Sequence, residues 1–103
     1  MIPEALRISG LTWGVRVKAK LKNDGGAGLW GQCLPAKQEI LLDRSVLKVP
    51  DRARRTLLHE AIHAMLESSK YYDDEDLVVR MEEKIDQFLM DNPDFRALYQ
   101  QHP

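Results

Sequence analysis

The chain has 103 residues, which is the length of one domain, so we expect a single domain over residues 1–103. Its 15 basic and 16 acidic residues leave a net charge of −1, which excludes the broad positive field that nucleic-acid binding needs. One cysteine, Cys33, excludes an internal disulfide and suits a reducing cytoplasm, and we expect neither a signal peptide nor a membrane span.

The first 43 residues predict β-structure. Apolar and charged residues alternate from Trp13 to Lys22, which indicates a strand with one buried and one solvated face. Shorter strands are expected over residues 29–33 and 38–43, and the simplest topology is a three-stranded antiparallel meander. Residues 2–9 fit either a helical turn or coil. We expect Trp13 and Trp30 to lie in the core of the sheet.

The remaining residues predict two main helices. The first begins at Pro50-Asp51 with Asp51 as the N-cap, and its apolar stripe is Leu57, Leu58, Ala61, Ile62 and Met65. The second covers about residues 74–90, with Asp73 or Asp74 as the cap, and ends before Pro93. Its apolar stripe is Leu77, Val78, Met81, Ile85, Phe88 and Leu89.

The strongest chemical signal is the segment His59-Glu60-Ala61-Ile62-His63. Residues four apart lie on one face of a helix, so His59 and His63 can present two imidazole nitrogens to one zinc ion. Glu60 lies beside them, in position to act on a water molecule at the metal. This face is opposite to the apolar stripe, as expected for a helix that packs on a sheet and lines a cleft.

A catalytic zinc usually has three protein ligands and one open position, so a third ligand is needed. The acidic start of the second helix is its expected source. Glu83 points away from the stripe that faces the first helix. Asp74 and Glu75 lie close to that stripe and Glu82 slightly less so, and helical-wheel geometry does not separate Asp74 from Glu75.

Three segments resemble one known family: residues 57–64, which contain the two histidines, residues 75–81, and Asp91-Asn92-Pro93. They resemble the small metallopeptidase-like proteins of phages and their bacterial hosts, which are minimal gluzincins. The resemblance extends over about residues 38–93. It implies an α+β, zincin-like domain in which a three-stranded, mainly antiparallel sheet packs on the motif helix and on a second, C-terminal helix.

The resemblance also implies the third ligand. In that family the ligand glutamate lies three residues before a Val and six before a Leu, and Val78 and Met81 occupy these positions here. This points to Glu75, with one zinc per chain held by His59, His63 and Glu75. Glu82 departs from the family pattern, which has a small residue there, so Glu82 remains a rival ligand or a supporting group.

These features predict a zinc-dependent metallopeptidase that acts on a peptide or protein substrate, with neither nucleic acid nor membrane as a partner. Zinc makes a bound water acidic, and Glu60 would act as the general base that takes its proton. Tyr71 or Tyr72 is the best candidate donor to the oxyanion, and substrate would extend along an edge strand. The alternative is a non-catalytic zinc-binding regulatory module with the same fold.

Overall fold

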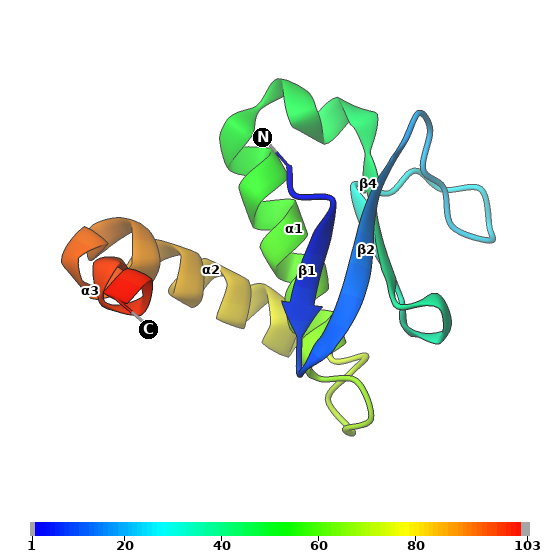
Figure 1. Ribbon diagram of the computed structural model, residues 1–103. Helices are drawn as coiled ribbons and strands as arrows, with labels where there is room; N and C mark the ends of the chain where they lie inside the picture. The colour runs from blue at the N-terminus through cyan, green and yellow to red at the C-terminus, as the bar shows by residue number, and fades with distance from the viewer. Residues whose placement is uncertain (1, 102–103) are drawn as a thin grey trace.

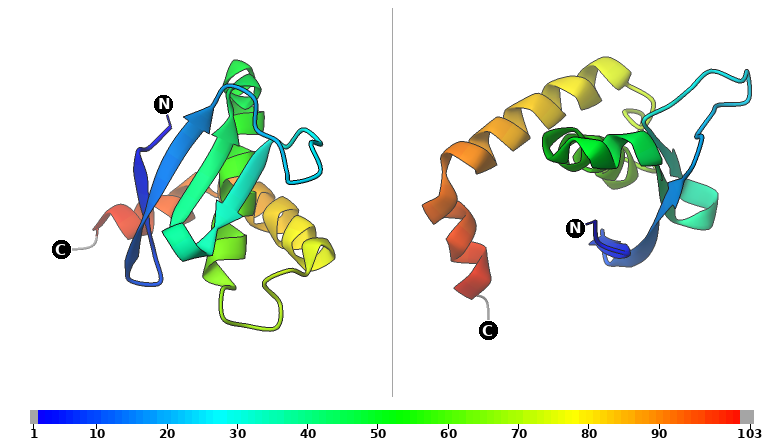
Figure 2. Two further views of the ribbon diagram at one scale, coloured as in Figure 1. Left: turned by 90° about the vertical axis from the view of Figure 1, so that its right-hand side faces the viewer. Right: turned by 90° about the horizontal axis from the view of Figure 1, so that it is seen from above.

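A four-stranded mixed sheet and three α-helices form the two layers of the computed structural model, which describes residues 2–101. The strands are β1 (Ala5–Ile8), β2 (Leu11–Lys18), β3 (Gly31–Leu34) and β4 (Glu39–Asp43). The helices are α1 (Pro50–Met65), α2 (Glu75–Asp91) and α3 (Pro93–Leu98). All three lie on the same side of the sheet, where α1 contacts the strands and α2 packs on α1 (Figures 1 and 2). The α+β class is therefore confirmed.

Residues 2–9 were expected to form a helical turn or coil, but residues 5–8 form a strand, β1, instead. β1 pairs with β2 in an antiparallel hairpin, and its turn is formed by Ser9 and Gly10, with φ of 52° and 80°. Positive φ at both central residues is what a two-residue type I′ turn requires. The strand count is therefore four, and the prediction of three strands is wrong.

The predicted antiparallel meander is also wrong, because β4 and not β3 pairs with β2, and does so in parallel. The sheet order is β1-β2-β4-β3, which leaves β3 at an edge. The reason is the continuous apolar run Ile40, Leu41 and Leu42, which is almost completely buried. Successive strand residues point to opposite faces, so such a run requires cover on both faces and favours a central position over an edge.

The main core lies between the sheet and α1. Trp13 is 1% exposed and Ile62 is fully buried, as the strand and helix periodicities predict. The cluster that contains Trp13 also includes Ile8, Val15, Ile40, Leu42, Val46, Ala53, Ala61 and Ala64. Ile62, Leu21, Leu41 and Val78 are buried outside this cluster. The prediction for Trp30 is wrong, because it precedes β3 and is 56% exposed, with the guanidinium of Arg52 at 4.4 Å from its ring centroid.

The N-cap of helix α1 lies two residues before Asp51, the expected cap. The N-cap is Val49, which makes no side-chain hydrogen bond, and Pro50 is the first helical residue. Proline fits this position because its φ is already helical and its missing N–H would have no partner there. Asp51 is therefore not the N-cap. It lies within the first turn, where the helix dipole stabilises its negative charge and its Oδ1 lies 2.9 Å from NH1 of Arg54.

Helix α2 begins as predicted, and its contacts with α1 reach as far along the helix as Asp86, which pairs with Arg54. Asp74 is the N-cap and accepts a hydrogen bond from the Leu77 amide at 3.0 Å. Of the expected apolar stripe, Val78 is the fully buried member, whereas Phe88 is 48% exposed. The second half of α2 and α3 extend away from the sheet (Figure 2), where Phe88 packs on Phe95.

Candidate metal centre

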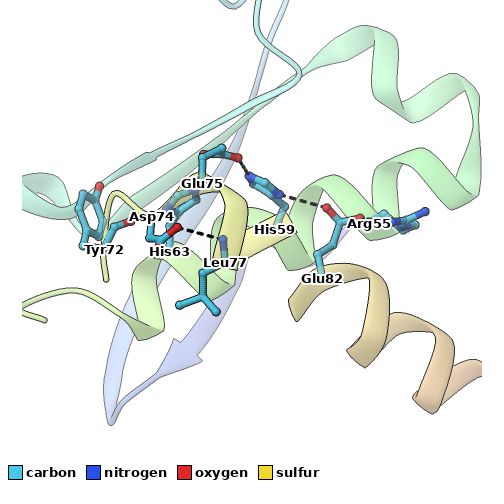
Figure 3. Close-up of polar contacts among 8 residues, drawn as sticks. All are labelled: Arg55, His59, His63, Tyr72, Asp74, Glu75, Leu77 and Glu82. Atoms are coloured by element: carbon cyan, nitrogen blue, oxygen red, sulfur yellow. Dashed lines mark hydrogen bonds and ion pairs between the residues drawn. The ribbon is translucent and has the colours of Figure 1, made fainter. Parts of the chain in front are cut away.

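Three side chains from two helices converge where α2 crosses α1. His59 and His63 lie one turn apart on α1, so their imidazoles project from the same face. Their Nε2 atoms face the two carboxylate oxygens of Glu75, at 2.5 Å for His59 and 3.1 Å for His63. The candidate ligand atoms lie within 4.8 Å of one another, which is close enough to hold one metal ion (Figure 3).

The other nitrogen of each imidazole has its own partner. Nδ1 of His63 lies 2.7 Å from the Tyr72 carbonyl oxygen, and Nδ1 of His59 lies 3.0 Å from Oε1 of Glu82. Carbonyl and carboxylate oxygens only accept hydrogen bonds, so both Nδ1 atoms are the donors. In a neutral imidazole, this leaves each Nε2 with a lone pair directed at Glu75.

The donor set therefore fits a cation. With both imidazoles neutral, their two Nε2 lone pairs and the carboxylate are all acceptors, so these groups cannot hydrogen-bond to one another. A divalent cation between His59, His63 and Glu75 turns this unfavourable arrangement into coordination. Two imidazole nitrogens and one carboxylate oxygen are a ligand set typical of catalytic zinc. At most metal sites the second nitrogen of each histidine ligand donates a hydrogen bond to an acceptor, as both histidines do here.

The structure separates the three acids that the sequence left open. Asp74 is occupied by the helix cap, where its Oδ1 accepts from Leu77. Glu82 contacts Nδ1 of His59, on the side of the ring away from Glu75. Glu75 alone of the three contacts the Nε2 atoms of both histidines. Glu75 is therefore the acid that completes the candidate trio. Glu82 instead holds the imidazole of His59 through its Nδ1 atom.

Glu60 lies next to this trio but forms no ion pair among the described residues. Its side chain is 8% exposed and borders the cleft above the centre. Burial raises the pKa of the Glu60 carboxyl above its ordinary value, and the nearby carboxylates of Glu75 and Glu82 add to this effect. A carboxylate whose pKa is raised above its ordinary value is a stronger base than an ordinary glutamate.

Gly31 in β3 allows Glu60 to occupy its place, and the sequence analysis missed it. A Cβ at Gly31 would lie 2.8 Å from Cγ2 of Thr56, and 3.0 and 3.1 Å from Cγ and Oε2 of Glu60. These distances are shorter than ordinary van der Waals contact, so the strand can approach α1 only without a side chain. A glycine inside a strand is the signal that could have indicated this close approach.

An open cleft with a volume of about 770 Å³ runs over the centre, between β3 and the start of α1 on one side and α2 on the other. Trp30 and Arg52 lie at one part of its rim, and Tyr72 lines it next to His63. Burial raises the pKa of the Tyr72 hydroxyl, so that hydroxyl stays protonated at neutral pH. Tyr71 does not line the cleft and is 43% exposed, with Lys70 over its ring.

Comparison with known proteins finds no matching family model, no matching curated protein and no matching solved structure. The resemblance to minimal gluzincins therefore stays a prediction from the sequence. Within residues 2–101, no helix combines the length and the apolar character that crossing a bilayer requires.

Proposed function

We propose that this chain is a zinc-dependent metallopeptidase in which His59, His63 and Glu75 hold the zinc and Glu60 is the general base. One observation carries the proposal: a buried glutamate lies beside three convergent metal-binding groups and faces an open cleft. A purely structural zinc site is closed by four protein ligands and has no use for such a carboxylate.

When bound, zinc supplies a Lewis acid that makes water acidic near neutral pH and polarises a substrate carbonyl. Glu60 takes the proton of the attacking water and passes it to the nitrogen of the leaving amine. The Tyr72 hydroxyl, which stays protonated and hydrogen-bonds to the Cys33 side chain, is the candidate donor to the developing oxyanion once it leaves that partner. Glu60 is buried, which limits its contact with bulk water.

The edge strand β3 supports a peptide as the substrate. Its inner edge pairs with β4, and its other edge lies at the wall of the cleft. Backbone groups at such an edge can pair with an extended peptide, which adds to the sheet as a further strand. The close approach of Gly31 to Glu60 would hold that peptide near the general base.

The test combines metal analysis with cleavage of a peptide library. The purified chain should bind one zinc per molecule, and mass spectrometry should detect cleaved peptides. Glu60→Gln should retain the zinc and lose cleavage, because the amide cannot accept the proton. Glu83→Gln, an exposed glutamate of α2, is the matched control and should keep full activity.

Two results would overturn the proposal. Equal cleavage by Glu60→Gln and the unmodified chain would remove Glu60 from the reaction. One zinc per chain with no cleavage of any peptide would replace the peptidase with the non-catalytic zinc-binding module.

A further inference from the structure

One side chain of α2 links the metal centre to the packing of the helices. Oε1 of Glu82 lies 3.0 Å from Nδ1 of His59, and Oε2 lies 2.6 Å from NH2 of Arg55, which belongs to α1 (Figure 3). The Glu82 side chain is 13% exposed and that of His59 is 16% exposed. Limited solvent access makes these contacts stronger than they would be on an open surface.

Glu75 and Glu82 act on the same imidazole from opposite sides. They lie seven residues apart, which is about two helical turns, so both project from the face of α2 that meets α1. Glu75 faces Nε2 of His59 and Glu82 faces Nδ1. Helix α2 therefore controls both nitrogens of one histidine.

The two histidines are held by anchors of different kinds. The anchor of His63 is a backbone carbonyl, that of Tyr72, which carries no full charge. The anchor of His59 is a side-chain carboxylate held by a guanidinium. Hydrogen bonds to charged groups are about twice as strong as those between neutral groups. The orientation of His59 therefore depends on Glu82 and Arg55, whereas that of His63 depends on the loop.

We propose that Glu82, held in place by Arg55, is a positioning residue that fixes the tautomer and ring orientation of His59 for metal binding. The hydrogen bond to Glu82 keeps the proton on Nδ1, which leaves Nε2 free to coordinate and fixes the plane of the ring. Loss of such a supporting group typically weakens metal binding about 10- to 100-fold. The inference rests on the proposed metal site but not on peptidase activity.

A neighbouring ion pair provides a matched control. Arg54 on α1 contacts Asp86 on α2 at 2.8 and 3.1 Å. Arg54 is next to Arg55 in the chain, and Asp86 lies one helical turn after Glu82. This pair joins the same two helices but touches neither histidine. Asp86→Asn therefore removes a comparable link between the helices and leaves the metal centre intact.

The experiment measures zinc affinity by competition with a chromophoric chelator and records the visible absorption of the cobalt-loaded chain. Glu82→Ala should weaken zinc binding about 10- to 100-fold and alter the cobalt spectrum, because His59 loses its anchor. Glu82→Gln should recover part of the affinity, since its amide oxygen still accepts from Nδ1. Asp86→Asn should leave affinity and spectrum unchanged. Thermal denaturation of each variant confirms that it is folded.

The proposal fails if Glu82→Ala binds zinc as tightly as the unmodified chain, or if Asp86→Asn weakens binding to the same extent. Unaltered affinity in Glu82→Ala, together with loss of cleavage in Glu60→Gln, would refute this inference and leave the peptidase in place. Weakened binding in Glu82→Ala, in a chain that cleaves nothing, would support the inference and refute the peptidase.

Discussion

Replacement of Gly31 by alanine tests whether the close approach of β3 to α1 positions the general base. The new Cβ would lie 2.8 Å from Thr56 and 3.0 Å from Glu60, so strand and helix must separate by a few tenths of an ångström. Overpacking of this kind costs about 1–3 kcal/mol, and the stiffer unfolded chain offsets about 0.4–1 kcal/mol of that cost. A net loss of about 1–2 kcal/mol lowers the Tm of a domain of this size by about 4–16 °C.

Activity should fall by a larger factor than stability alone explains. A displacement of about 1 Å can cost about 100-fold in rate, so we expect kcat/KM to fall about 10-fold or more. Zinc content should stay at one per chain, because Gly31 touches no candidate ligand. The assays are thermal denaturation, metal analysis and cleavage of a peptide found in the library.

Gly28→Ala is the matched control, because a Cβ there meets nothing within 4 Å. It should change neither Tm nor activity appreciably. Unchanged Tm and unchanged cleavage in Gly31→Ala would refute the reasoning, since the Glu60 carboxylate would then not depend on this contact.

Removal of zinc by a chelator should lower Tm, because an ion that binds only the folded chain stabilises it, and His63→Ala should abolish the difference; equal Tm values with and without chelator would argue against a bound ion. Ile62→Ala should cost about 2–5 kcal/mol in urea denaturation, because this side chain is fully buried, and a much smaller loss would contradict that packing. Asp74→Ala should cost about 0.5–2 kcal/mol through loss of the helix cap, whereas Asp74→Asn should retain most of it; an equal loss in both would place the effect elsewhere. Burial raises the pKa of the Cys33 thiol to about 11, so little of it is thiolate at neutral pH. A thiol reagent at about pH 8 should therefore modify Cys33 far more slowly in the folded chain than in the unfolded chain, and equal rates would contradict this.

Local patterns account for what the sequence predicted well. The four-residue spacing of His59 and His63 places both on one helix face whatever surrounds that helix, because helical geometry depends only on the backbone. The same holds for Asp74, whose cap involves a residue three positions away. The choice of Glu75 over Asp74 came from resemblance, and the structure brings Glu75 close enough to share a metal ion with both histidines.

By itself, then, the sequence determined the two main helices, the motif face and the alternation of β2 as far as Lys18, all of which depend on neighbours within a few residues. The predicted continuation of that strand to Lys22 is wrong, because β2 ends at Lys18 and Ala19 is exposed. Only the tertiary structure decided the central place of β4, the anchor that Glu82 provides for His59, and the fit of Gly31 against Glu60. Each of these joins residues far apart in the chain. Their energies depend on which surfaces become buried together, and no local pattern contains that information.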